Sequence, residues 1–277
     1  MAEPDLTAEA HTMLQSWFAF IDAMQAQQES AHRLWPVEPG SSIALDDDLT
    51  SPLQVGHQVQ RLIHVASDHL TAIRRLLGGE PAASQPSQGV VSVYADYTLV
   101  RGALEAAMLG HWILLPSDRI ERVRRCLTLM SQDFFDEYKA AERLSMHELG
   151  GPQVLAEAKR RHDRGKAAIE RVAAQAGIYG PIPRLRIEQA LSEVDAATAR
   201  QLLLMWKIAS GMTHGRLWAG LTMSTVTEMA DHGDDTVTIR TEGNLLRVTV
   251  AVGDAVSALK ALLRLFELRR TVPACSG

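Results

Sequence analysis

The spacing of apolar residues is the feature that most restricts how this chain can fold. From Leu6 to Leu268, apolar residues recur at intervals of three and four, which is the period of an amphipathic helix. Alternation with a period of two, typical of strands, occurs only at residues 236–240 and 245–250, on either side of a Thr-Glu-Gly-Asn turn. The chain is therefore expected to be mainly α: a multi-helix bundle with one short β-hairpin before the C-terminal helix.

Capping residues and glycine or proline breaks divide the chain into segments. Residues 35–50 are predicted as a loop, and the Pro- and Ser-rich residues 79–89 as a mobile surface loop. Two neighbouring helices, 118–149 and 152–176, are expected to form a long antiparallel hairpin. The predicted helices cover residues 7–34, 52–78 after a Ser-Pro-Leu-Gln capping box, 90–115, 118–149, 152–176, a stretch from Asp195 through Trp206 towards Trp218, and 254–270 with Asp254 as cap.

The composition is that of a folded globular protein. Hydrophobic residues make up 46% of the 277 residues and charged residues 22%, which excludes a mainly disordered chain. No internal repeat at solenoid periods is visible. We expect a single helical domain over residues 1–277 that ends in a disordered tail over residues 271–277.

Charge and cysteine content indicate the compartment and the class of partner. The net charge of −5 makes nucleic acid an unlikely partner, because phosphates would meet no general attraction. Two cysteines, Cys126 and Cys275, supply neither a disulfide framework nor a cysteine metal site. The longest mostly apolar run, residues 103–115, is shorter than the ~20 residues of a membrane span. Without a secretory signal pattern at the N-terminus, we expect a cytoplasmic protein that does not bind membranes.

Four polar residues share one face of the predicted helix 52–78. His57, Arg61, His64 and Asp68 follow one another at spacings of four, three and four residues. Histidine and aspartate can bind metals, and histidine can relay a proton near neutral pH. The same spacing also occurs on solvated helix faces. We therefore expect no bound metal, and His57, His64 and Asp68 are the weak candidates for a metal site.

A second candidate site lies on the apolar helix 90–115. Arg101 and Glu105 stand four residues apart, and burial favours an ion pair between them. The pair could simply fix the helix register. Alternatively, Arg101 would anchor an anion and Glu105 would act as an acid or base in a pocket between helices. Tyr97, His64 and Trp112 would complete the ligand-binding set.

A third candidate is the segment of residues 205–218, which carries Ser210 and His214 four residues apart among apolar residues. A serine nucleophile would need an exposed turn such as Gly-x-Ser-x-Gly, which this segment lacks. The alternative is that Ser210 and His214 satisfy each other and nearby carbonyls in a tight helix crossing, which Gly211 and Gly215 would allow. The candidate catalytic residues are thus Glu105, His214 and Ser210.

The run from Trp206 to Gly215 resembles the Ser-x-x-x-His-Gly helix of HEPN-like helical proteins. Residues 97–105, followed by Trp112, look like the Arg-x-x-x-Glu … Trp helix of uncharacterised bacterial families of that kind. In ribonuclease members of the group, an arginine separated from a histidine by four to six residues forms a metal-independent RNA-cleaving site across a dimer. Here Lys207 takes that place before His214, and lysine lacks the planar bidentate grip of arginine on phosphate. The resemblance therefore implies a dimeric binding module without cleavage activity.

Three functions remain as hypotheses. The first is a non-catalytic HEPN-like binding or interaction module that forms a homo-oligomer and takes a small-molecule or protein partner. The alternative is an enzyme or small-molecule binder that uses an inter-helix pocket with Arg101, Glu105 and His57 or His64. The third is a metal-independent ribonuclease centred on His214. No glycine-rich phosphate loop or dinucleotide fingerprint occurs, so no cofactor is indicated.

Overall fold

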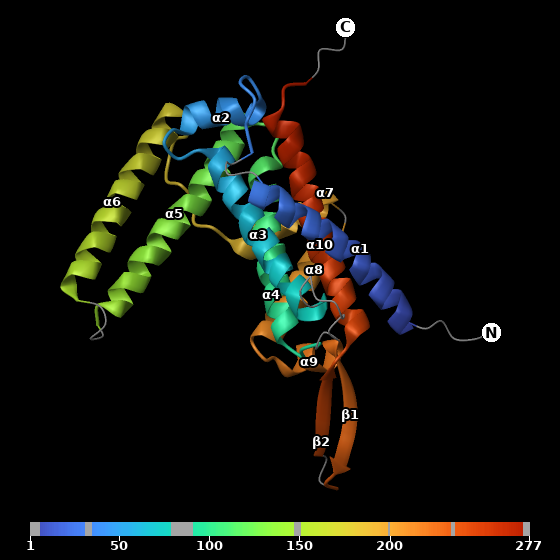
Figure 1. The fold of residues 1–277 in the computed structure, drawn as a ribbon. Coiled ribbons are helices and arrows are strands. Elements are labelled where there is room, and N and C mark those ends of the chain that lie inside the picture. The colour runs from blue at the N-terminus through green and yellow to red at the C-terminus, as the bar shows by residue number, and fades with distance from the viewer. Residues whose placement is uncertain are drawn as a thin grey trace. The chain divides into compact units, whose positions relative to one another are not determined.

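The computed structural model describes residues 6–30, 35–78, 91–146, 151–198, 200–233 and 236–273. These residues form ten α-helices and one two-stranded antiparallel sheet, so the predicted mainly α fold with a β-hairpin before the C-terminal helix is confirmed (Figure 1). The elements in chain order are α1 (Leu6–Ser30), α2 (Ser42–Thr50), α3 (Val55–Gly78), α4 (Ala95–Leu114), α5 (Arg119–Leu144), α6 (Pro152–Gln175), α7 (Ile187–Thr198), α8 (Leu202–Thr213), α9 (Leu217–Met223), β1 (Ser224–Asp231), β2 (Val237–Gly243) and α10 (Leu245–Arg270).

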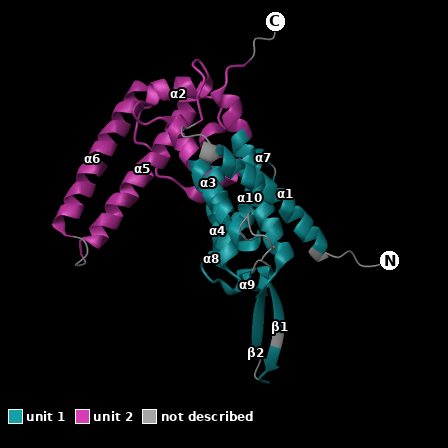
Figure 2. Cartoon of the chain, viewed as in Figure 1, with its two compact units in different colours: residues 1–33, 62–108, 195–263 teal, residues 34–61, 109–194, 264–277 magenta. Residues whose placement is uncertain are grey.

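The chain divides into two compact units, each assembled from three separate segments (Figure 2). Unit 1 contains residues 1–33, 62–108 and 195–263, and unit 2 contains residues 34–61, 109–194 and 264–277. The single domain stays a prediction. The expected mobile loop at 79–89 lies outside the described residues, as does the expected tail beyond residue 273. Residues 271–273 are described, and the N–H of Val272 donates to the Glu38 carboxylate at 2.7 Å.

The core of unit 1 is built from the apolar faces of α1, α3, α4 and α10. Side chains that recur every three to four residues can all be buried against neighbouring helices. In α4, Val100, Ala103, Leu104 and Ala107 are inaccessible to solvent, as expected for a helix enclosed by others. The largest contributions from the other three helices come from Phe18, Ile21, Ile63, Leu70, Ile73, Val256 and Leu259.

Only one of the two strands predicted from the alternation is part of the β-hairpin of unit 1: the predicted strand 236–240 falls mostly within β2. β1 pairs with β2 in an antiparallel register that sets Ser224 opposite Gly243. The stretch 245–250, predicted as the second strand, is instead the first part of α10, and the Asn244 carboxamide oxygen accepts from the N–H of Arg247 at 3.1 Å as its cap. Residues 245–250 are helical rather than extended because Val248 belongs to the row of buried side chains that continues along α10. Asp254, the predicted cap, lies inside this helix.

The prediction of a loop before Thr50 was wrong, because residues 42–50 form α2. Ser41 is its N-cap, and its hydroxyl accepts from the N–H of Ala44 at 3.2 Å. The predicted capping box at residue 51 is not the start of α3 either. Instead, the Asp47 carboxylate accepts from the N–H of Gly56 at 2.8 Å, in the first turn of α3. Asp47 precedes Gly56 by nine residues, so this contact does not follow the short spacing of a local capping box.

Unit 2 contains the predicted helical hairpin of α5 and α6, which run side by side (Figure 1). Asp118 caps α5 as predicted, since its carboxylate accepts from the N–H of Glu121 at 2.8 Å. The two helices approach closely at Gly165: a Cβ at this position would lie 2.6 Å from the ring of Phe134. Glycine is therefore required here for the close contact rather than for its backbone freedom.

A buried ion pair joins α2 to α5 within unit 2. The Asp46 carboxylate is inaccessible to solvent and accepts two hydrogen bonds from the Arg122 guanidinium, at 2.7 and 2.9 Å. The same guanidinium donates to the carbonyls of Pro116 and Ser117 at 3.1 and 2.8 Å. Burial of charged groups is tolerated when hydrogen bonds compensate their lost hydration, and Arg122 meets that condition.

Candidate ligand-binding site

A glycine turn sets the direction of the chain after α6. Ala176 is the C-cap, and Gly177 follows with φ +71°, in the left-handed region that favours glycine. The N–H of Gly177 donates to the carbonyl of Ala174 at 3.1 Å, and that of Ile178 donates to Ala173 at 2.8 Å. These two bonds complete a Schellman motif. The turn brings the residues that follow it back against α5 and α6.

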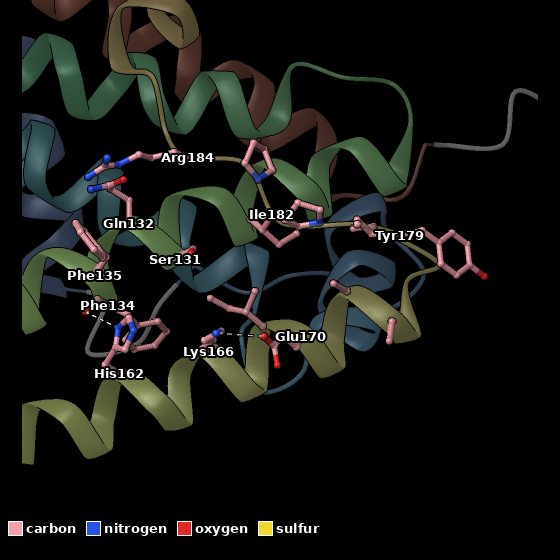
Figure 3. A pocket seen from close by; sticks show the side chains of 17 residues that line it. Ser131, Gln132, Phe134, Phe135, His162, Lys166, Glu170, Tyr179, Ile182 and Arg184 are labelled. Carbon is pink, nitrogen blue, oxygen red and sulfur yellow. Dashed lines mark hydrogen bonds and ion pairs between the residues drawn. The ribbon is translucent and has the colours of Figure 1, made fainter.

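The space between α5, α6 and this returning segment is a cavity of about 750 Å³ (Figure 3). Small-molecule sites in proteins span about 300–1,000 Å³ and are mostly apolar with a few polar groups. The residues that line this one are Ser131, Gln132, Phe134, Phe135, His162, Lys166, Ile169, Glu170, Ala173, Ala174, Ile178, Tyr179, Gly180, Pro181, Ile182, Pro183 and Arg184. Aliphatic and aromatic side chains thus make most of its wall.

The polar groups of the cavity make weak contacts with one another. His162 Nδ1 lies 3.3 Å from the carbonyl of Phe134. Lys166 and Glu170 form a long ion pair of 3.9 Å, and both side chains are exposed. The guanidinium carbon of Arg184 lies 5.0 Å from the ring centroid of Phe135, within the range of a cation–π contact. These groups leave the cavity with one positive charge beyond the Lys166–Glu170 pair.

A second hollow of about 390 Å³ adjoins the cavity, because Pro183 and Arg184 line both. Its wall is far more polar. The lining residues are Trp112, Glu121, Arg124, Arg125, Thr128, Pro183, Arg184, Leu185, Arg186, Gln189, Ala190 and Glu193. Four arginines against two glutamates give this hollow an excess of positive charge.

Both glutamates of the second hollow already have cationic partners. Glu121 accepts from Arg124 at 2.6 Å and from Arg125 at 2.8 Å. Although burial opposes ionisation, these hydrogen bonds hold the pKa of the Glu121 carboxyl below its usual value. Glu193 pairs with Arg125 at 2.8 Å and accepts from the Trp112 indole N–H at 3.1 Å. Among the described residues, no carboxylate forms an ion pair with Arg184 or Arg186.

The pair Arg101 and Glu105, predicted as a ligand-binding centre, forms in unit 1 as an ion pair of 3.0 Å. Glu105 also accepts from the indole N–H of Trp206 at 3.0 Å, and the Arg101 guanidinium lies 5.6 Å from the Trp206 ring centroid. Arginine, glutamate and tryptophan therefore form one set of contacts that links α4 to α8, although the buried Nε of Arg101 has no hydrogen-bond partner among the described residues. The arrangement matches the structural alternative, although both charged side chains keep partial exposure.

The other residues predicted for that pocket do not gather around it. Tyr97 is buried in unit 1 with its hydroxyl 3.4 Å from the carbonyl of Met223, and burial raises the pKa of this phenol. Trp112 belongs to unit 2, where it lines the second hollow. His64 is exposed on α3. One of the predicted ligand-binding residues, Trp112, thus lines a hollow that the structure forms.

The stripe of residues considered for metal binding lies on the exposed face of α3. His57, Arg61, His64 and Asp68 are all exposed, and Arg61 pairs with Asp133 at 2.8 Å. Among the described residues, no group of three or more His, Cys, Asp or Glu side chains could hold a metal ion. A solvated helix face explains the stripe.

The segment with Ser210 and His214 is the end of a helix. The N–H of Gly215 donates to Met212 at 3.0 Å and that of Arg216 to Gly211 at 2.9 Å, which is again a Schellman motif. His214 is exposed at the C-cap, and Gly215 has φ +62°. The predicted helix from Asp195 to Trp218 is therefore not continuous. Asp195 lies in α7, α8 ends at this turn, and Trp218 lies in α9 after it.

Of the two glycines expected to allow a tight helix crossing, Gly211 makes a close contact and Gly215 has no atom within 4 Å of its Cβ position. A Cβ on Gly211 would lie 2.7 Å from the Trp218 ring and 2.8 Å from the Ala219 Cβ. Asp195 lies within α7, but its carboxylate accepts from the N–H of Leu203 at 3.1 Å, in the first turn of α8. Asp195 therefore caps a helix, as predicted, but the helix is α8, which begins after α7 has ended.

The residues that make the cavity were missed at the level of sequence. The sequence patterns place Phe134 and Phe135 only within the predicted helix 118–149, and residues 177–183 fall between predicted helices. The available signal was the density of apolar residues within that stretch, where Ile178, Tyr179 and Ile182 stand among glycines and prolines. An apolar segment that cannot form a helix must lie against another surface to be buried.

Comparisons with protein-family models, with curated proteins and with solved structures found no match to this chain. Among the described residues, no helix combines the length and apolar character needed to cross a membrane.

Replacing Gly177 with alanine is expected to lower the free energy of unfolding by about 1 kcal/mol, because alanine is strained at φ +71°. The Cβ itself would meet no atom within 4 Å, so backbone strain alone should account for the loss. Urea denaturation followed by circular dichroism measures the change. Gly177→Asn is the control: asparagine tolerates this conformation better, and its loss should be smaller. An equal loss for both variants would contradict this explanation.

Proposed function

We propose that the protein is a non-catalytic binding protein that holds a small, mainly apolar molecule in the cavity between α5, α6 and residues 178–184. The observation that carries the proposal is the wall of this cavity. Two phenylalanines, three isoleucines, two alanines and two prolines face one space of about 750 Å³, with polar side chains in the minority. Such a combination is characteristic of small-molecule sites.

The wall supports binding by burial of apolar surface. Phe134 and Phe135 are partly exposed, and Ile178 and Ile182 are held beside them by the segment after Gly177. A ligand that covers these side chains removes apolar area from water at roughly 25 cal/mol per Å² before the costs of association. Aromatic rings in the ligand would gain further contact with the two phenylalanines.

A binding rather than a catalytic role is supported by the contacts of the candidate acids, bases and nucleophiles. Glu105 is committed to Arg101 and Trp206, and His214 ends a helix beside a left-handed glycine. Ser210 lies one turn before that helix end, and its carbonyl accepts from the N–H of His214 at 3.1 Å. The Glu105 carboxylate thus has structural partners, and the backbone groups of Ser210 and His214 form the end of α8.

The proposal is tested with N-phenyl-1-naphthylamine, an uncharged probe whose fluorescence rises in apolar surroundings. Wild-type protein should bind it with saturation. Ala174→Trp should weaken binding at least about tenfold, because an indole would occupy the cavity that Ala174 lines. The matched control is Ala167→Trp: residue 167 is also exposed on α6 but does not line the cavity, and this variant should bind like wild type.

Two results would overturn the proposal. One is a wild-type protein that gives no saturable fluorescence increase. The other is equal weakening by both tryptophan variants, which would place the probe elsewhere. HEPN-like ancestry, self-association and a cytoplasmic location stay predictions from the sequence.

A further inference from the structure

We infer that the molecule held in the cavity is an organic anion whose acidic group binds Arg184 and Arg186 in the adjoining hollow. The inference rests on the proposed function and names the chemical class of its ligand. Three observations carry it: the two hollows are adjacent, two arginines of the second have no carboxylate partner among the described residues, and the geometry of Arg184 suits an acidic group at the boundary.

The two hollows are neighbours, because Pro183 and Arg184 line both the apolar cavity and the polar hollow. Pro183 and Arg184 are exposed, so a molecule seated among Phe134, Phe135 and Ile182 would reach the second hollow across the surface of these two residues. An apolar body and a polar end of one ligand would then each meet matching surroundings.

The charge available to a ligand comes from Arg184 and Arg186. In the second hollow, Arg124 and Arg125 are occupied by Glu121, and Arg125 also by Glu193. Among the described residues, neither Arg184 nor Arg186 pairs with a carboxylate. In the apolar cavity, Lys166 lies beside Glu170, so that pair adds no net charge. The positive excess of the combined site is thus concentrated on the segment just before α7.

Arg184 is placed to receive a planar acidic group. Its guanidinium packs near the Phe135 ring at 5.0 Å, a contact that leaves the N–H groups at its edge available for hydrogen bonds. A guanidinium can grip a carboxylate, sulfonate or phosphate with two parallel hydrogen bonds. Because both arginines are exposed, solvent and salt weaken this attraction, and a gain of roughly tenfold in affinity is expected.

The experiment compares two probes that share one ring system. 1-Anilinonaphthalene-8-sulfonate carries an acidic group, and N-phenyl-1-naphthylamine lacks it. Wild-type protein should bind the sulfonate about tenfold more tightly at low salt, and added salt should reduce only that advantage. The double variant Arg184→Gln/Arg186→Gln should remove the advantage. Arg186 lines only the second hollow, so Arg186→Gln alone should reduce the advantage and leave the affinity for the uncharged probe unchanged.

The matched control is Arg164→Gln/Arg171→Gln, which removes the same charge from exposed positions of α6 that line neither hollow. It should keep the preference for the sulfonate. Equal binding of the two probes by wild type would overturn the inference while leaving the proposed function standing. Loss of affinity for both probes in Arg186→Gln would also overturn it, because this arginine would then act on the cavity itself. Failure of the uncharged probe to bind wild type is the separate result that removes the proposed function.

Discussion

Replacing Arg122 with methionine is expected to lower the free energy of unfolding by about 3–5 kcal/mol. The change leaves the Asp46 carboxylate buried without its bidentate partner, and it also removes the donors to the carbonyls of Pro116 and Ser117. Methionine keeps an unbranched apolar stem, so the loss should come from the missing hydrogen bonds and charge rather than from an empty space. Urea denaturation monitored by circular dichroism measures the difference.

The control for this prediction is Arg160→Met, which breaks an ion pair with Glu157 on the exposed side of α6. The denaturation midpoint of this variant should match that of wild type, because ion pairs in water contribute little. A second variant, Asp46→Asn with Arg122 intact, should lose stability as well, since the guanidinium would then lack its counter-charge. Equal midpoints for Arg122→Met and Arg160→Met would show that the buried ion pair contributes no more to stability than the exposed one.

Replacing Gly165 with leucine is expected to destabilise unit 2 by about 1–3 kcal/mol, as overpacking does in a closely packed interface. The first added carbon would already lie 2.6 Å from the Phe134 ring, so α5 and α6 must move apart or the ring must turn. Phe134 also lines the cavity, and the affinity for N-phenyl-1-naphthylamine should therefore change in the same variant.

Ala167→Leu serves as the comparison for Gly165→Leu, because residue 167 lies on the same helix with its side chain exposed. It should leave both stability and probe binding unchanged. If Gly165→Leu proves as stable as wild type and binds the probe equally well, the close approach of the helices at this point has no structural importance.

Most of the helical architecture could be predicted because local signals and burial agree. The hairpin of α5 and α6 has Asp118 at one end and Gly177 at the other, and both act as the sequence indicates. The predictions were wrong where contacts with distant parts of the chain determine the secondary structure. α2 is capped by Ser41 without a long apolar repeat, and residues 245–250 alternate locally yet continue the buried face of α10.

The candidate site was harder to predict for a physical reason. A cavity depends on which side chains leave space between them, and this is a property of packing rather than of spacing along the chain. Polar residues within apolar helices, such as Glu105 and His214, draw attention in a sequence because they are costly to bury. In this protein Glu105 pairs with Arg101 and accepts from Trp206, and His214 is exposed at the end of α8. The cavity lies instead among ordinary phenylalanines and isoleucines beside a glycine–proline break.

The interleaving of the two units along the chain has a consequence for biosynthesis. Unit 1 needs residues up to 263, and unit 2 includes residues 264–277, so neither unit can be completed while the ribosome is still making the middle of the chain. The first helices of unit 1 cannot complete their packing until residues 195–263 have been synthesised. A single proteolytic cut cannot release either unit whole, and a shortened chain that ends after α6 would lack part of both.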